Sequence, residues 1–373
     1  MLGADSITEL LADLVRARSV NPPGNEDLAA EVLRGFLDAH GVPATVDYVQ
    51  PHRPNLIARV GSGQPSVLLT SHLDVVEPGE LSRWDRDPFS GDLDGGSLYG
   101  RGACDAKGSL AAMAAALVSL AKDPPCEIVL LAVMGEEKGG LGSKHFAAGG
   151  MNFDAAVVGE PTQLNIAIGQ KGRVGIFLDL VGDAAHPTQA SSDVNPVVRL
   201  AEVMAFLREF GDEAREGGLG AFVVLGVSAG QEGVLTPPER CSVRASWWFP
   251  PTMDHDAAIS LFASRLDDFA GRESVPHEIR FHRGAAAYSM DPAHPFVAAA
   301  GQCVQGVLGH PPDVSEFPAS CDMYVFGREG IPTIVMGPGD IGLAHSPNES
   351  IRVDLVLAAS RVYVELANAM SAG

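Results

Sequence analysis

The chain has 373 residues, of which 46% are hydrophobic and 20% charged, a composition typical of a globular protein with two domains or one large interrupted core. Its formal net charge of −21 repels phosphate backbones, so we exclude nucleic acid as a partner. The five cysteines are widely spaced and form no C-x-x-C pair, which excludes a disulfide framework and a thiolate zinc site and favours a reducing compartment.

The N-terminal segment is acidic and has no basic region followed by an apolar run, so we expect no signal peptide. No apolar run reaches about 18 residues, and we therefore expect no membrane span. Together with the cysteine pattern, these features predict a cytoplasmic protein without a membrane partner.

The first part of the chain predicts helices that alternate with strands. Apolar residues at helical spacing indicate helices over 6–17 and 26–40, separated by the Pro-Pro-Gly break at 22–24. An Ala-rich helix at 108–120 lies among apolar runs of strand length, which are 55–60, 66–73, 127–133 and 155–159. This alternation predicts an α/β fold with a mainly parallel sheet that helices cover on both faces.

The middle of the chain has a different pattern. Strands and helices there follow the order β-α-β-β-α-β of a ferredoxin-like module. The larger pattern then resumes with a helix at 295–308, a buried strand at 332–336 and a last helix at 353–370. We therefore predict one α/β domain formed by residues 1–173 and 285–373, with an inserted smaller domain at 174–284.

The run T-S-H-L-D ends an apolar strand with two polar side chains, His72 and Asp74. Residues two apart on a strand point to the same side, so His72 can bind a metal through one nitrogen while Asp74 orients the other. Open α/β sheets also bind ligands at the carboxyl ends of their strands. Taken alone, the pair is more simply explained as a surface histidine with a nearby acid at a strand end.

Three glycines surround Asp105 in the run G-R-G-A-C-D-A-K-G, directly before the Ala-rich helix. Glycines permit close approach of the backbone, so this segment can present the carboxylate at the start of the helix. An ordinary N-cap aspartate is the alternative explanation.

More acids and a second histidine follow other apolar strands. Glu136 and Glu137 follow 127–133, Glu160 follows 155–159, and His345 follows 332–336. Adjacent carboxylates repel each other unless they are solvated or bind a cation, and in a metal site one can be a ligand while the other acts as a base. A charged turn is the alternative for the Glu-Glu pair.

Together these strand ends provide two histidines and three carboxylate ligands, with one glutamate to spare. Mixed imidazole and carboxylate ligands suit Zn²⁺, Co²⁺ or Mn²⁺ better than Ca²⁺ or Mg²⁺. If Asp105 is shared, each of two metals receives three protein ligands and keeps a position open for water and substrate, as a catalytic site requires.

The motifs that carry these residues resemble those of the M20 metallopeptidase family, which includes acetylornithine deacetylase, succinyl-diaminopimelate desuccinylase, aminoacylase and carboxypeptidase G2-like enzymes. The resemblance covers nearly the whole chain. It rests on the order and spacing of the runs S-H-L-D-V-V, D-P-F-S-G, G-R-G-A-C-D-A-K-G, G-E-E-K-G-G, V-V-G-E-P-T and A-H-S-P-N-E.

The resemblance implies a ligand set for two metal ions, zinc before cobalt or manganese. His72, Asp105 and Glu160 would hold one ion, and Asp105, Glu137 and His345 would hold the other.

The resemblance also implies roles for the residues around the metals. Glu136 would be the general base, taking a proton from a bridging water and later giving one to the leaving amine. Asp74 would orient His72, and the Asp105–Ala106 peptide bond would be cis.

The inserted domain would be the lid and dimerisation domain of the family, which predicts a homodimer. His186, in the run A-H-P-T, would reach a substrate carbonyl and stabilise the oxyanion. A solvated loop histidine is the alternative.

Two positions depart from the pattern of many relatives. Trp248 and Tyr324 stand where an arginine is common, and losing a bidentate carboxylate clamp is not a conservative change. Either the substrate is a less usual acyl amino acid or peptide, or Arg173, Arg244 or Arg283 substitutes from a neighbouring position.

We therefore expect a metal-dependent amidohydrolase that removes an N-acyl group from an amino acid or related amine. The alternatives are a dipeptidase or carboxypeptidase with the same chemistry, a cysteine hydrolase acting through Cys104 or Cys321, and a homologue without activity. A nucleotide-binding module is disfavoured because no glycine-rich phosphate loop follows a strand.

Overall fold

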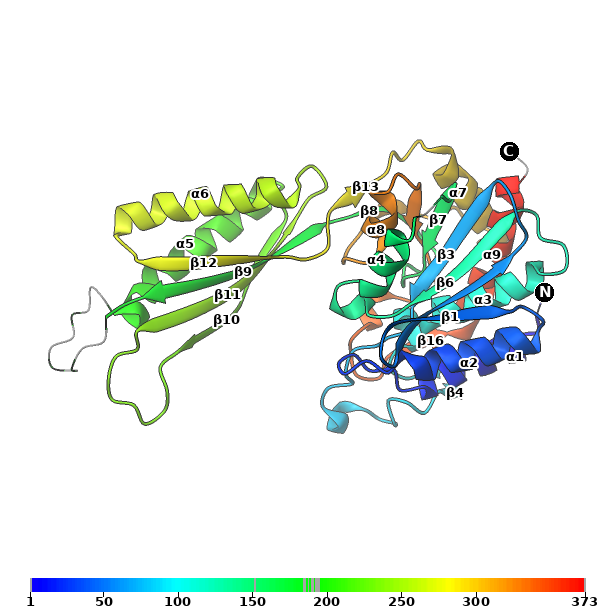
Figure 1. Cartoon of the computed structure of the whole chain (residues 1–373), viewed down its shortest axis with the longest axis horizontal. Helices are drawn as coiled ribbons and strands as arrows, with labels where there is room; N and C mark the ends of the chain where they lie inside the picture. Colours follow the sequence, from blue (N-terminus) through cyan, green and yellow to red (C-terminus); the bar gives the residue numbers. More distant parts are fainter. Residues whose placement is uncertain are drawn as a thin grey trace. The chain divides into compact units, whose positions relative to one another are not determined.

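The computed structural model describes residues 2–150, 152–183, 186, 188, 191 and 195–371. The chain divides into two compact units (Figure 1). The first unit consists of Met1–Gly169, Ser289–Phe317 and Cys321–Gly373, and the second of Gln170–Tyr288 and Pro318–Ser320. The predicted insert, 174–284, falls within the second unit.

A mixed sheet forms the centre of the first unit, with strand order β1-β2-β6-β3-β7-β15-β8-β13 and β14 paired to β8. The pairs β6-β3, β3-β7 and β7-β15 are parallel, whereas β1-β2, β2-β6 and β15-β8 are antiparallel. The strands are β1 (Ala44–Gln50), β2 (Arg53–Val60), β3 (Ser66–His72), β6 (Glu127–Val133), β7 (Ala155–Val158), β8 (Ile166–Gln170), β13 (Tyr288–Ser289), β14 (Val314–Phe317) and β15 (Thr333–Val335). The predicted α/β class with a parallel centre in a mixed sheet is confirmed.

Helices cover both faces of this sheet, and all seven residues of β3 are buried. Figure 1 shows α4 (Leu141–Ala148) and α8 (Met323–Gly327) in front of the sheet. The helices whose apolar residues form one buried cluster with alternate strand residues are α1 (Ala4–Arg16), α2 (Glu26–Ala39), α3 (Gly108–Leu120), α7 (Pro295–Leu308) and α9 (Val353–Ser371). Because parallel central strands are buried on both sides, their ionisable side chains lie at their ends.

The stretch 103–120, which ends with α3, bears on the expectation of no membrane span. By length and composition it passes the test for a helix that could cross a membrane, since the charges of Asp105 and Lys107 do not break it. Some 89% of the stretch is buried inside the protein. A core helix passes the same test, and α3 packs between the sheet and α9 in that way.

A small three-stranded sheet in the first unit joins segments that are far apart in the sequence. Its order is β16-β5-β4, formed by β4 (Asp92–Asp94), β5 (Ser97–Tyr99) and β16 (Ser350–Arg352). The Gly100 amide donates to the carbonyl of Glu349 at 2.9 Å. The chain after His345 is therefore held against the glycine-rich segment that carries Asp105.

The second unit is a four-stranded antiparallel sheet in the order β10-β11-β9-β12, with two helices. Its elements are β9 (Gly172–Val181), α5 (Pro196–Glu216), β10 (Ala221–Ala229), β11 (Arg240–Phe249), α6 (His255–Glu273) and β12 (His277–Arg283). Burial alternates along β9, as in a sheet covered on one face. Aromatic rings fill the space between that face and the helices, with Phe210 edge-on to Trp247 and Phe262.

Candidate metal centre

Three neighbouring parallel strands bring chemically active side chains to one edge of the main sheet. His72 is the last residue of β3, the Glu136–Glu137 turn follows β6, and Glu160 follows β7. The carboxyl ends of parallel strands meet at the same edge, which is where such sheets bind ligands. The strand-end pattern of the sequence thus becomes a cluster in space.

Asp105 lies between two histidines and offers one carboxylate oxygen to each. Its Oδ1 is 3.1 Å from His72 Nε2, and its Oδ2 is 3.2 Å from His345 Nε2. Glu160 Oε1 lies 3.9 Å from His72 Nε2, and Glu137 Oε1 lies 3.0 Å from His345 Nε2. The ligand atoms of each resulting trio lie within 4.8 Å of one another. The two trios share Asp105, which is the arrangement of a bridging carboxylate.

The donor set fits two divalent cations of the zinc, cobalt or manganese type, because each trio combines imidazole nitrogen with carboxylate oxygen. His72, Asp105 and Glu160 are buried, whereas half of the His345 side chain is exposed. Three acids and two imidazoles packed this closely need positive charge to balance them.

The pKa values of these groups follow from that crowding. Hydrogen bonds to Asp105 and Glu137 raise the pKa of His345 to about 10. Burial raises the pKa of Glu160 well above its usual value. Burial also acts to raise the pKa of Asp105, but hydrogen bonds from His345 and His72 outweigh it and lower that pKa. Without metal, protons on the histidines balance the acids, so metal binding would release protons and strengthen with rising pH.

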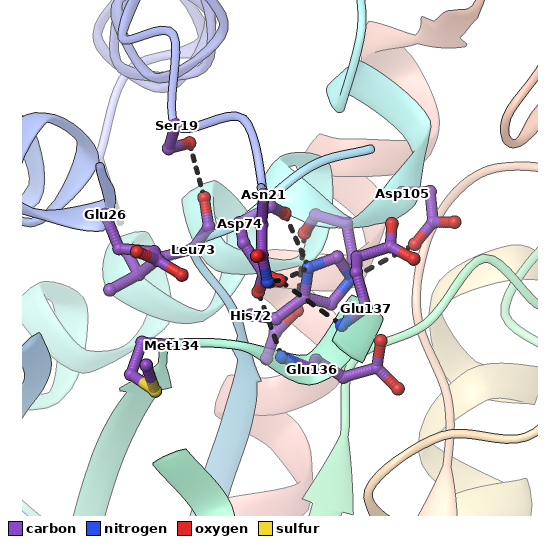
Figure 2. Close-up of polar contacts among 12 residues, drawn as sticks. Ser19, Asn21, Glu26, His72, Leu73, Asp74, Asp105, Met134, Glu136 and Glu137 are labelled. Carbon is purple, nitrogen blue, oxygen red and sulfur yellow. Dashed lines mark hydrogen bonds and ion pairs between the residues drawn. The ribbon is translucent and has the colours of Figure 1, made fainter. Parts of the chain in front are cut away.

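Asp74 holds the turn that carries the two adjacent glutamates (Figure 2). Its carboxylate accepts the backbone amides of Glu136 at 3.1 Å and Glu137 at 3.2 Å, and the Asn21 side chain donates to it at 2.8 Å. His72 Nδ1 instead contacts the Asp74 main-chain carbonyl at 2.8 Å and lies 3.7 Å from the carboxylate. Asp74 therefore orients His72 mainly through its backbone, while its carboxylate positions the glutamate turn.

Glu136 belongs to neither trio and is half-buried beside them. Gly135 allows the turn to form because its φ of 72° lies in the left-handed region. Burial raises the pKa of Glu136 well above its usual value, and the negative charges of Asp322 and Glu160 add to that shift. A carboxyl group with a raised pKa, held beside the ligand trios, is suited to proton transfer.

Glu349 supports the bridging acid and received no role in the sequence analysis. It is fully buried, pairs with Arg101, and accepts the backbone amides of Cys104 at 2.9 Å and Asp105 at 3.0 Å. The Asp105–Ala106 peptide bond beside it is cis, as the family resemblance implies. In the sequence, the feature that could have pointed to Glu349 is its place at the end of the run A-H-S-P-N-E.

Asp322 is a further buried acid beside Glu136 that the sequence analysis did not assign. Ser143 donates to its Oδ2 at 2.5 Å, which joins α4 to the start of α8. Burial raises the pKa of Asp322 to about 6. The acid cluster therefore extends beyond the five predicted ligands and Glu136.

Lys107 is a buried cation without a carboxylate partner among the described residues. Its Nζ donates to the carbonyls of Leu14 at 2.7 Å and Ala17 at 3.0 Å, which ties α1 to the segment that carries Asp105. Burial lowers the pKa of Lys107 from 10.5 to about 7. Between pH 7 and pH 10.5, Lys107 is protonated in the unfolded chain and neutral in the folded protein. The free energy of unfolding therefore increases with pH across this range.

We predict that Lys107→Met destabilises the metal-free protein by about 1–3 kcal/mol at pH 10, because two buried carbonyls lose their donor. The destabilisation should be smaller at pH 7, where the wild-type protein has not yet gained stability from the buried neutral amine. Urea denaturation of both proteins between pH 7 and 10 measures the difference. A destabilisation that stays constant across this range would contradict the assignment.

The cysteine alternative is disfavoured by the surroundings of both thiols. Cys104 and Cys321 are buried, and burial raises the pKa of each thiol. The Cys104 thiol donates to the carbonyl of Asp340 at 3.2 Å. Since the thiolate is the nucleophile, these environments oppose its formation.

His186 lies in the second unit, where it is exposed and its Nδ1 is 2.8 Å from Thr188 Oγ1. Ala185 and Pro187, its neighbours in the predicted motif, lie outside the described residues. Its contact with a substrate carbonyl stays a prediction.

The substituted arginine positions differ in their surroundings. Trp248 is half-buried on β11 opposite Arg173 of β9. Arg283, one of the possible substitutes, pairs with Asp256. Tyr324 is buried on α8 of the first unit.

Comparison with known proteins supports the class that this geometry defines. The family model for peptidase family M20/M25/M40 matches residues 68–369. The probable succinyl-diaminopimelate desuccinylase of Staphylococcus aureus (strain MSSA476) is 32% identical over 213 residues, 56% of this chain and 52% of that protein. The match thus spans about half the length of that relative.

Two further likenesses extend over most of the chain. Acetylornithine deacetylase of Vibrio atlanticus is 27% identical over 344 residues, 89% of this chain and 88% of that protein. The crystal structure of a tripeptidase from Staphylococcus aureus subsp. aureus Mu50 superposes with a TM-score of 0.84 at 18% identity and covers 100% of both chains. The chain belongs to peptidase family M20/M25/M40, which confirms the resemblance seen in its motifs.

Proposed function

We propose that this protein is a two-metal hydrolase that cuts an amide bond and removes an N-acyl group from an amino acid or a related amine. The observation that carries the proposal is the position of Asp105, whose two oxygens face two separate ligand trios. A single carboxylate shared in this way supports a two-metal site rather than two isolated ion pairs.

His72, Asp105 and Glu160 would hold one cation, and Asp105, Glu137 and His345 the other. When bound, zinc, cobalt or manganese ions would polarise the scissile carbonyl and lower the pKa of a water. Glu136 then takes the proton from the attacking water and returns a proton to the leaving amine. Asp74 keeps Glu136 in reach of that water by holding its backbone amide.

A dipeptidase or carboxypeptidase is the alternative, because peptide hydrolysis uses the same chemistry. The likeness in overall structure to a tripeptidase supports this alternative, and the likeness in sequence to a desuccinylase and a deacetylase supports deacylation. We favour deacylation because relatives with that activity show the higher sequence identity.

A substrate screen tests the proposal. Purified protein loaded with Zn²⁺, Co²⁺ or Mn²⁺ is assayed against N-acetyl and N-succinyl amino acids and against dipeptides. Metal-dependent release of amine from the acyl amino acids is the expected result. Cleavage of dipeptides alone would favour the peptidase, and turnover that survives chelation but not thiol alkylation would overturn the metal mechanism.

We predict that single mutations can remove the metal ion of one trio while the other trio keeps its ion. His72→Ala and His345→Ala should each lower the metal content from about two ions to about one, because each removes one of three ligands from one trio. Asp105→Ala should remove both ions, since both trios lose a ligand. Elemental analysis after dialysis measures this, and exposed His310→Ala is the control. Equal metal loss in all three site variants would contradict a shared bridge.

The second unit completes the proposal. We propose that it acts as the lid and dimerisation domain, that His186 stabilises the oxyanion, and that the protein works as a cytoplasmic homodimer. All five cysteines are free, which is consistent with a reducing compartment. Sedimentation analysis tests the dimer, and a monomer at micromolar concentration would contradict it.

A further inference from the structure

The segment that carries Glu136 is rich in glycine. Four of the nine residues from 134 to 142 are glycines, and three of these glycines have φ values between 67° and 102°, in the left-handed region. Glycine loses more conformational freedom on folding than any other residue, so a segment of this composition needs hydrogen bonds from its surroundings to stay in one conformation. The Asp74 carboxylate supports the middle of the segment through the amides of Glu136 and Glu137. A different side chain holds the two ends.

Asn55 is the side chain that joins the two ends of this segment. β2 runs antiparallel to β6 with Leu56 opposite Ala132, so Asn55 lies beside the end of β6. Asn55 is buried, its Oδ1 accepts the Met134 amide at 3.1 Å, and its Nδ2 donates to the Gly142 carbonyl at 2.9 Å. The Gly142 amide donates in turn to the Met134 carbonyl at 3.0 Å. These three hydrogen bonds form a closed ring between Asn55 and the first and last residues of the segment.

The segment fits closely against Asn55. A Cβ atom at Gly142 would lie 2.4 Å from Asn55 Oδ1, so the residue at this position must lack a side chain for the two to approach in this way. A side-chain amide also suits the site chemically, because it offers an acceptor to the Met134 N–H and a donor to the Gly142 carbonyl. A carboxylate at position 55 would lack the donor, and an apolar side chain would remove both hydrogen bonds.

We propose that Asn55 is a positioning residue for amide hydrolysis. By fixing both ends of the segment 134–142, it keeps the carboxyl group of Glu136 at the place from which it takes the proton of the attacking water. The inference rests on the proposed hydrolase function with Glu136 as its base, and it adds a residue that belongs to neither ligand trio. A displacement of about 1 Å can lower the rate of a catalysed reaction about 10²-fold, so loosening the ends of the segment should slow catalysis.

A double-mutant cycle with the base tests this role. Asn55→Ala should lower kcat about 10- to 100-fold and change KM less than about twofold. In the Glu136→Ala background, the same substitution should lower kcat less than about twofold, because a residue that acts through Glu136 has no effect once that carboxyl group is gone. Since Glu137 lies in the same segment, each variant is assayed at a metal concentration that saturates its activity.

Thr333→Val is the matched control. It also removes a buried hydrogen bond of the main sheet, which the Thr333 hydroxyl donates to the Ile331 carbonyl at 2.8 Å. Thr333 is the first residue of β15, which is parallel to β7, and so lies at the end of the strand away from the edge that carries Glu160. The control should therefore leave kcat unchanged.

An unchanged kcat in Asn55→Ala, a change confined to KM, or equal losses of kcat in the two backgrounds would overturn the positioning role while leaving the hydrolase assignment in place. If Asn55→Ala does not fold, Gly142→Ala provides the second test, because its Cβ forces the segment away from Asn55 while the Asn55 side chain stays. Gly142→Ala should then give the same pattern in the cycle, and additive losses would overturn the inference.

A measurement without turnover separates this inference from the proposed function. If the wild-type protein hydrolyses no substrate in the screen, the proposed function fails, and hydrogen exchange of the metal-free protein then tests the contact itself. The backbone amides of Glu136 and Glu137 should exchange at least about tenfold faster in Asn55→Ala than in the wild-type protein, but not in Thr333→Val. Exchange at the wild-type rate in Asn55→Ala would show that Asn55 does not hold the segment.

Discussion

Replacing Glu136 with alanine should lower kcat by about 10²- to 10⁴-fold while both metal ions stay bound, because general base catalysis contributes a factor of this size. Glu136 stands outside both ligand trios, yet its backbone amide is held by Asp74 beside them. Its carboxyl group is therefore positioned for proton transfer and is not needed as a ligand. Steady-state kinetics and elemental analysis of the same preparation measure the two properties together.

Glu137 provides the matched control, since it is adjacent in sequence and similar in chemistry but belongs to a trio. Glu137→Ala should lose one of the two ions, whereas Glu136→Ala should lose none. Glu136→Gln keeps the shape of the side chain and should be as inactive as the alanine variant. If Glu136→Ala retains wild-type turnover, or if it loses metal as Glu137→Ala does, the assignment of the base is wrong.

Glu349→Gln should destabilise the protein by about 3–5 kcal/mol, because it leaves the buried guanidinium of Arg101 without its counter-charge. Arg101 is 2% exposed and Glu349 is 0% exposed, so solvent cannot compensate. The same variant should also weaken metal binding, up to about 10-fold, since the backbone amide of the bridging Asp105 then has a neutral amide oxygen as its acceptor in place of a carboxylate. Chemical denaturation of the metal-free protein and metal titration measure these effects.

A double variant separates the two contributions of Glu349. Arg101→Met combined with Glu349→Met removes both buried charges and should recover part of the stability that the single variant loses. Metal affinity should stay low, because methionine at position 349 offers the Asp105 amide no acceptor. Glu9→Gln, which changes an exposed acid on α1 away from the metal ligands in the sequence, should stay within about 0.5 kcal/mol of the wild-type protein. A Glu349→Gln protein as stable as Glu9→Gln would contradict a role for the ion pair.

Several elements of the fold were predictable because their pattern is local. The predicted bounds of α3, β6 and α7 agree with the structure residue for residue. Buried strands and core helices have continuous or periodic apolar residues, which a sequence displays directly. The edge strand β1 was not predicted, because its residues are half-buried or exposed and make no apolar run. β8 and α4 were also missed, since their burial depends on neighbours that are distant in the sequence.

The metal centre also has features that were predictable from the sequence and features that were not. His72, Glu137 and Glu160 were predictable as ligands because each lies at or shortly after the end of an apolar strand, and parallel neighbours end at one edge. The backbone contact between Asp74 and His72, and the hydrogen bonds from the Asp74 carboxylate to the glutamate turn, were not predictable. They depend on the angle at which two loops meet after different strands.

The sequence by itself therefore determined the α/β class, the family and the set of side chains available for two metals, because strand ends and motif order are properties of the chain. Only the tertiary structure decided which oxygen of Asp105 faces which histidine, that Glu349 supports Asp105 from 244 positions away, and that Asn55 joins the two ends of the segment that carries Glu136. These contacts join segments that meet only after the sheet has assembled. Their geometry follows from packing between distant segments, which no local pattern of residues encodes.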